Sequence, residues 1–141
     1  MNLRKNILAV VLISFLVVTF SSCAKRVSFQ SSSYAPTANG RVKVKKDKNN
    51  NYNLDIFVRN LAESKNLEAP RDNYVVWSET ESNGVKNIGQ ITSSTRLFSK
   101  KLKASLHAVS SYKPTRIFIT TEDNGNVQYP GFRTILTTNS F

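Results

Sequence analysis

The chain has 141 residues, a length that suits one folded domain together with any segment that is removed. Lys and Arg total 20 and Asp and Glu total 9, so the formal net charge is +11, while hydrophobic residues make up 40% of the chain. This balance is typical of a globular protein and excludes a disordered one. A single Cys and a single His exclude an internal disulfide framework and a zinc site of the usual Cys and His ligands.

Residues 1–22 have the pattern of a signal peptide. Arg4 and Lys5 form a short basic region, and the run over 7–20 is apolar at all but two positions. A helix over this run would rise about 21 Å, which is less than the roughly 30 Å hydrocarbon core of a bilayer. The run therefore suits a cleaved export signal better than a permanent membrane span.

Residues 20–23, Phe-Ser-Ser-Cys, resemble a bacterial lipobox, the motif that is cut immediately before a cysteine that carries lipid. The small Ser21 and Ser22 suit the peptidase, whereas Phe20 departs from the aliphatic residue that usually opens the motif. The resemblance implies cleavage between Ser22 and Cys23, a diacylglyceryl thioether on Cys23, and an amino terminus acylated with a fatty acid such as palmitate. Stable anchoring takes two membrane signals and three acyl chains exceed that, so we expect a lipid-anchored protein. An uncleaved anchor helix is the alternative.

Residues 23–40 are predicted to be the lipidated cysteine and a flexible tether, because Ser, Pro, Asn and Gly are enriched and no hydrophobic period emerges. Lys25 and Arg26 lie beside the anchor and are candidates for contact with anionic lipid, with a solvated basic pair as the alternative. By resemblance to known lipoprotein sorting rules, Ala24 indicates the periplasmic face of an outer membrane.

Residues 41–141 are predicted to form one all-β domain. Apolar and polar residues alternate over 42–45 and 54–59, with a turn between them, which predicts a hairpin of half-buried strands. A segment over 98–108 fits either a strand or a helix over 96–109, and the β-rich context favours the strand. Other strands are predicted over 74–77, 85–91, 115–121 and 133–138. About seven short strands at this spacing predict an immunoglobulin-like β-sandwich.

The second half of this domain resembles the C-terminal extracytoplasmic domain of the anti-sigma-K factor family. The features that carry the resemblance are Tyr74-x-x-Trp77, a turn at Asn83-Gly84, Gly89, Ile119-Thr120-Thr121-Glu122, Gly125, Pro130-Gly131 and a closing strand around Ile135-Leu136. The resemblance implies an immunoglobulin-like fold located in the envelope. That family carries a sigma-binding domain and a membrane-spanning helix before this domain, and a lipoprotein signal stands here instead. Sigma-factor inhibition is therefore not implied.

Three aromatic residues, Tyr74, Trp77 and Tyr129, are candidates for stacking on a sugar, which would make the domain a carbohydrate-binding module. For Trp77, between apolar strand residues, a buried core position is favoured. Glu79 and Glu81 share a strand face, but a glycosidase needs two carboxylates on opposite sides of a bond in a cleft. We therefore predict that the protein is not an enzyme.

Two further polar groups are interpreted as structural. Glu122 and Asp123, near Asn124 and Asn126, offer oxygen ligands for calcium, but a turn with capping side chains is favoured. His107 lies on the polar side of its strand and is predicted to be a surface residue. No metal or other cofactor is predicted.

The lysines form two basic clusters, one at 43–48 and one at 100–103. Such charge often binds nucleic acid, but export to the envelope makes that partner improbable. Anionic lipid, lipopolysaccharide phosphates and acidic glycans are the envelope partners that this charge suits, and part of it protects an edge strand from sheet-to-sheet association. The sequence thus predicts a non-enzymatic, membrane-anchored envelope lipoprotein that binds an envelope protein or an anionic glycan, with a carbohydrate-binding module as the alternative.

Overall fold

The computed structural model describes residues 23–61, 73–92 and 103–141, and all its regular elements are β-strands. The prediction of an all-β fold is confirmed. The predicted signal peptide over 1–22 lies outside the described residues, as do Lys100 and Lys101 of the second basic cluster. The strands are β1 (Lys25–Ser31), β2 (Asn39–Lys46), β3 (Tyr52–Arg59), β4 (Asn73–Thr80), β5 (Gly84–Ile91), β6 (Lys103–Ser110), β7 (Pro114–Glu122) and β8 (Thr134–Thr138).

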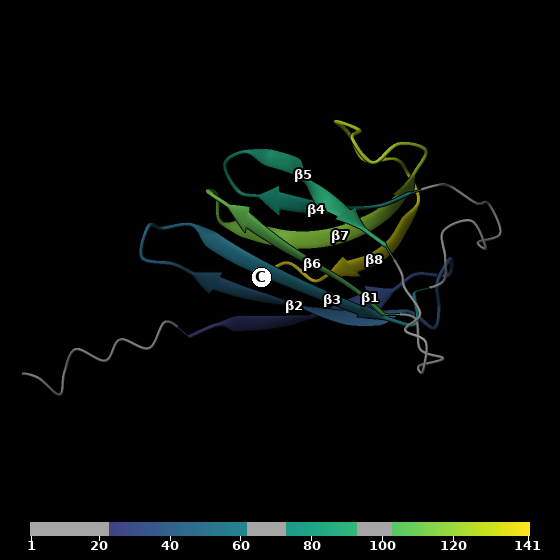
Figure 1. Ribbon diagram of the computed structural model, residues 1–141, viewed down its shortest axis with the longest axis horizontal. Helices are drawn as coiled ribbons and strands as arrows, with labels where there is room; N and C mark the ends of the chain where they lie inside the picture. Colours follow the sequence, from purple (N-terminus) through teal and green to yellow (C-terminus); the bar gives the residue numbers. More distant parts are fainter. Residues whose placement is uncertain (1–22, 62–72, 93–102) are drawn as a thin grey trace, which may run out of the picture.

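The strands form one antiparallel sheet that folds over on itself. Their order is β5-β4-β7-β8-β1-β2-β3-β6. Figure 1 shows β5, β4 and β7 above β1, β2 and β3. The two edge strands approach each other, because a Cβ on Gly89 of β5 would meet the side chain of Leu106 of β6 at 3.2 Å. The sheet is therefore nearly closed around a single interior.

The strand β1 belongs to both halves of the sheet. Residues 25–28 pair with β2, and residues 29–31 pair with β8. A strand that changes partners along its length forms the corner between two packed layers. We call the part formed by β6, β3, β2 and the first half of β1 the lower half-sheet, and the remainder the upper half-sheet.

The prediction of a flexible tether over 23–40 is wrong. The first strand begins at Lys25, and Phe29 within it is buried in the core, as are Ala35 and Ala38 in the connection to β2. The high serine content of this segment obscured the strand in the sequence pattern, because the strand has few apolar residues and these face inward. The described residues therefore form eight strands, one more than the sequence pattern predicted.

The core consists of side chains from alternate positions along the strands, as the two-residue period predicts. The lower half-sheet contributes Val42, Leu54 and Ile56, and the upper half-sheet contributes Ile117 and Ile119, all fully buried. The aliphatic faces of both halves thus meet in one apolar interior.

Local turn chemistry fixes the hairpins where the sequence predicted them. Between β2 and β3, Asn50 adopts a φ of 64°, and the Asp47 carboxylate accepts hydrogen bonds from the backbone N–H groups of Asn49 and Asn51 at 2.8 and 2.9 Å. Between β4 and β5, Gly84 adopts a φ of 63°, which suits glycine. The described part of the ambiguous segment over 98–108 is the strand β6, as favoured.

Candidate functional site

Four strands of the lower half-sheet place cationic side chains on one outward surface. Along β1, β2, β3 and β6, residues that alternate with the core positions are exposed or half-buried. We call this surface the basic sheet face. Its Lys and Arg residues are Arg26, Arg41, Lys43, Lys45, Arg59 and Lys103.

The strand register sets these residues in rows across the sheet. Arg26 of β1 is paired with Lys43 of β2. The same row continues through Asp55 of β3 to His107 of β6. Directly opposed residues have Cβ atoms about 4.5–5.5 Å apart, so the side chains of one row can contact a ligand together.

An aromatic ring lies among the cations. Phe57 of β3 points outward with 45% of its surface exposed, and it is paired with Arg41 of β2 on one side and Ser105 of β6 on the other. The guanidinium carbon of Arg41 is 5.8 Å from the centre of the Phe57 ring, within the range of a cation–π contact. Because Ser105 is small, the ring is left open to solvent on that side.

The basic sheet face has one carboxylate among the described outward positions of its four strands, that of Asp55. Its Oδ1 atom lies 2.7 Å from Nδ1 of His107, so this anion is engaged by the imidazole. The His107 side chain is 62% exposed, which confirms the prediction of a surface histidine. The cations around this pair therefore outnumber the anion by a wide margin.

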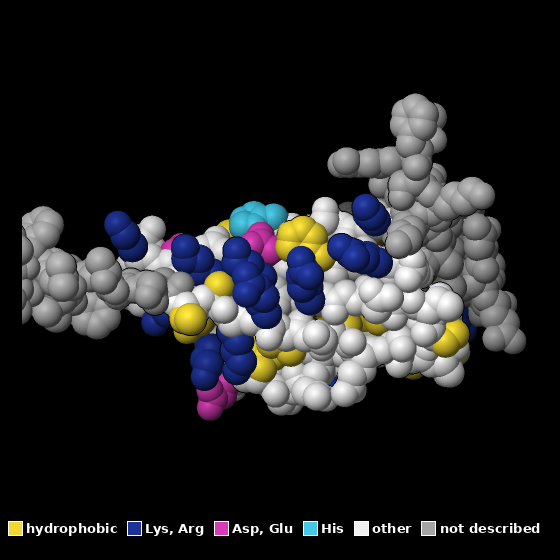
Figure 2. Space-filling view, turned by 90° about the horizontal axis from the view of Figure 1, so that it is seen from below, with side chains coloured by type: hydrophobic (Ala, Val, Ile, Leu, Met, Phe, Trp, Pro, Cys, Tyr) yellow, Lys and Arg dark blue, Asp and Glu magenta, His cyan; other side chains and the backbone are white. Residues whose placement is uncertain are grey.

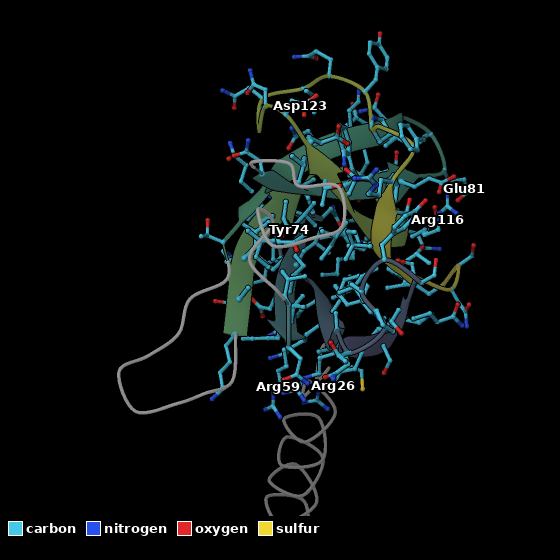
Figure 3. The ribbon with its side chains drawn as sticks, turned by 90° about the vertical axis from the view of Figure 1, so that its right-hand side faces the viewer. Arg26, Arg59, Tyr74, Glu81, Arg116 and Asp123 are labelled. Atoms are coloured by element: carbon cyan, nitrogen blue, oxygen red, sulfur yellow. The ribbon has the colours of Figure 1, made fainter. Side chains whose placement is uncertain are left out.

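Charge is distributed unevenly between the two half-sheets. Among the described residues, the strands of the lower half-sheet and their connections carry nine Lys and Arg residues and two Asp residues, whereas the rest carries four of each sign. Figure 2 shows the dark-blue Lys and Arg side chains spread over the face seen from below. In Figure 3, Arg26 and Arg59 lie on that lower side and Asp123 lies at the opposite end. The positive charge is thus concentrated on one surface.

The candidate membrane-contact residues lie at the start of this surface. Cys23 is an exposed, free cysteine two residues before β1, and Ser22, the other residue of the predicted cleavage site, lies outside the described residues. Arg26 is exposed and belongs to the basic sheet face. Lys25 is also exposed, and its Nζ atom lies 5.5 Å from the ring centre of Phe141.

Two of the three aromatic candidates for sugar binding are not at the surface. Tyr74 is 3% exposed and belongs to the main core, while Trp77 has no exposed surface. The suggestion that they form a sugar-binding platform is therefore wrong, whereas the buried position favoured for Trp77 is confirmed. Tyr129 is 85% exposed and remains available for binding.

Trp77 is buried outside the main core, in a small cluster on the outer surface of the upper half-sheet. It packs with Val75 and Phe118, and its ring is stacked on that of Phe118 with centroids 6.3 Å apart. The β7–β8 loop (123–133) covers this cluster, with Val127 packed against it. The side-chain amide of Asn87 donates hydrogen bonds to the carbonyl oxygens of Gly125 and Val127, which holds the loop on β5.

A chain of hydrogen bonds joins Trp77 to the same loop. The indole N–H of Trp77 donates to the hydroxyl oxygen of Thr120 at 2.7 Å, and that hydroxyl donates to the Glu122 carboxylate at 2.5 Å. The same carboxylate oxygen accepts a hydrogen bond from the backbone N–H of Gly131 at 2.7 Å. Glu122 thus has a structural role, and it does not extend into a turn as a calcium ligand would.

Glu79 and Asn124 also make ordinary structural contacts. Glu79 Oε2 accepts a hydrogen bond from Arg116 Nε at 2.6 Å on the surface of the upper half-sheet. The Asn124 side chain accepts one from the backbone N–H of Asn126, as expected for a capped turn. Within residues 23–61, 73–92 and 103–141, no group of three His, Cys, Asp or Glu residues is placed to hold a metal ion. Those ranges also contain no helix with the length and apolar character needed to cross a membrane.

No family model, curated protein or solved structure matches this chain. The resemblance of residues 74–138 to the anti-sigma-K domain therefore stays a prediction that rests on the motif residues alone.

The lysines over 43–48 are visible in the sequence as a cluster, but the surface that contains them is not. A signal for this surface was present in the two-residue period of β3, because Phe57 and Arg59 occupy the outward positions that alternate with its buried apolar residues. The hydrogen-bonded link from Trp77 to Glu122 had no comparable signal. It depends on a loop folding back over a sheet, which local sequence patterns do not specify.

Replacing Thr120 by Val should destabilise the protein by about 1–3 kcal/mol, because the substitution leaves the buried indole N–H and a carboxylate oxygen without their shared partner. Urea unfolding followed by the fluorescence of Trp77, the single tryptophan, measures the change. Thr37→Val, at an exposed position, is the matched control and should unfold like the wild type. Equal midpoints for both variants would contradict the role given to Thr120.

Burial raises the pKa of Tyr74 to about 12, from 10.0 in the unfolded chain. Between these values the unfolded chain has released the phenol proton and the folded chain has kept it, so the free energy of unfolding falls as the pH rises. The loss should reach at most about 2–3 kcal/mol. Unfolding curves across this pH range should show a shallower decline for Tyr74→Phe, whereas the exposed control Tyr129→Phe should follow the wild type. An unchanged slope in Tyr74→Phe would disprove the assignment.

Proposed function

We propose that the protein is a non-enzymatic lipoprotein of the bacterial cell envelope, anchored through Cys23, whose basic sheet face binds an anionic component of that envelope. The observation that carries the binding role is the concentration of six Lys and Arg residues on the outward face of four strands, with Asp55 as the accompanying carboxylate among the described positions. The lipobox at residues 20–23 supports the anchor. The periplasmic face of an outer membrane is the location that Ala24 favours.

The charge of the face suits an extended anionic partner better than a small ligand. Its cations are spread over the rows of a sheet, and each Lys or Arg near an anionic surface contributes roughly 1 kcal/mol. Single surface charges are weak and screened by salt, but several that act on one surface add to a useful affinity. Binding by this face should therefore depend steeply on salt.

The same combination of cations with an exposed aromatic ring would also suit single-stranded nucleic acid. The predicted export signal argues against that partner, because the mature domain would be separated from the cytoplasm. Nucleic acids and envelope lipids both present phosphates to these cations, so the location of the domain decides which of the two it can bind.

A carbohydrate-binding module is the second candidate function, with Tyr129 as the one exposed residue of the three aromatic residues predicted for it. Tyr129 and Phe132 are 85% and 79% exposed, and both belong to the loop over 123–133 that Asn87 and Glu122 hold in place. Exposed rings on a fixed loop are a platform on which a sugar can stack. Glycan binding that is lost in Tyr129→Ala and kept in Phe57→Ala would favour this candidate.

Metabolic labelling with a palmitate analogue tests the anchor. The wild-type protein should carry the label and sediment with membranes, and Cys23→Ser should lose both properties, because the only thiol in the chain is removed. Ser22→Ala keeps a small residue before the cysteine and should be labelled like the wild type. Label that persists in Cys23→Ser would overturn the anchor assignment.

A further inference from the structure

We infer that the basic sheet face lies on the lipid headgroups of the leaflet that holds the Cys23 anchor, so that the domain rests flat on its own membrane with Phe57 in the headgroup layer. The inference rests on the proposed lipid anchor and names the partner of the same face. That partner is an anionic phospholipid surface.

The connection between the anchor and the fold is short. Cys23 is followed by Ala24, and β1 begins at Lys25. An extended chain spans at most about 3.3–3.6 Å per residue, so the Cα atom of Arg26 lies no more than about 11 Å from that of Cys23. This reach is close to the Debye length of about 8 Å at physiological salt. A domain held this close cannot avoid the potential of the membrane surface.

The anchor joins the sheet on the side of the basic sheet face. Residues 25–28 of β1 pair with β2, so the lipid is attached directly to the lower half-sheet. Arg26, three residues after Cys23, is paired with Lys43 and starts a row of the basic sheet face. The anchor therefore brings this half of the molecule to the bilayer before any other.

The two sides of the molecule differ in charge. The lower side carries the six cations of the basic sheet face, whereas Asp123 lies at the opposite end (Figure 3). The described residues of the upper half-sheet and its connections carry equal numbers of the two charges. An anionic leaflet attracts the basic sheet face and exerts little net attraction on the upper half-sheet. The electrostatic torque on the anchored domain therefore turns the basic sheet face toward the membrane.

The exposed ring of Phe57 also suits a lipid surface. A half-exposed phenyl group surrounded by cations gains little in water, but it matches the boundary between headgroups and acyl chains, where cationic side chains meet phosphates and aromatic rings enter apolar material. An acidic glycan or a nucleic acid would use the same cations, but neither would bring Phe57 next to acyl chains. The position of this ring relative to lipid therefore distinguishes the partners.

The test uses the full, lipidated protein reconstituted in vesicles of phosphatidylglycerol and brominated phosphatidylcholine, because bromine on the acyl chains quenches nearby tryptophan. Phe57→Trp places a reporter on the basic sheet face, and Tyr129→Trp is the matched control at an exposed site on the β7–β8 loop. The native Trp77 is buried and gives the same background in both variants. We expect several-fold stronger quenching of the added tryptophan in Phe57→Trp than in Tyr129→Trp.

The quenching should also show the charge dependence that the docking requires. It should fall toward the control value when Arg41, Lys43 and Lys45 are all changed to Glu in the Phe57→Trp protein. It should fall likewise at about 1 M salt, where the Debye length is near 3 Å. A mixture of neutral lipids alone should leave the reporter largely unquenched.

Equal quenching of the two reporters, with acyl mass present on Cys23, would overturn this inference and leave the lipid anchor intact. A reporter at Phe57 that responds to a soluble acidic polysaccharide or to single-stranded DNA, and not to brominated lipid, would assign the face to that polymer and also overturn it. Absence of acyl mass would instead refute the proposed function.

Discussion

The first strand hydrogen-bonds to β2 through residues 25–28 and to β8 through residues 29–31. This double pairing joins the lower and upper half-sheets into one continuous hydrogen-bonded sheet. The two edge strands of that sheet, β5 and β6, approach each other at Gly89 and Leu106. Phe29, at the point where the partner changes, is buried in the common core. The same pairing places the proposed lipid attachment next to the lower half-sheet, because β1 begins two residues after Cys23.

The alternation of side chains along a strand gives the lower half-sheet two surfaces of opposite character. Val42 of β2 and Ile56 of β3 point into the core, and the residues that alternate with such core positions, among them Lys43 and Phe57, point outward. A single strand pattern therefore provides both the stability of the domain and the charge of its proposed binding surface. The upper half-sheet uses its outer surface differently, since the β7–β8 loop covers Trp77 there and carries the exposed rings of Tyr129 and Phe132.

Local patterns were sufficient to predict the strands that alternate clearly and the turns that need special backbone angles, such as those at Asn50 and Gly84. They failed for β1, because its burial depends on Phe29 finding partners from both half-sheets, and serine-rich composition outweighed that one residue. They also left the site incomplete. The lysines were visible as a run, but their assembly with Arg59 and Lys103 into one face required the strand order, which is a property of distant pairing.

We propose that the anchored domain has a fixed orientation, set by β1 and by the charge of the basic sheet face. Paramagnetic broadening of backbone amide signals by a spin-labelled lipid, recorded on the lipidated protein in anionic nanodiscs, measures that orientation directly. We expect the strongest broadening for β2 and β3 around Lys43 and Phe57, and little for residues 123–133. Broadening centred on the β7–β8 loop, or spread evenly over both half-sheets, would contradict it.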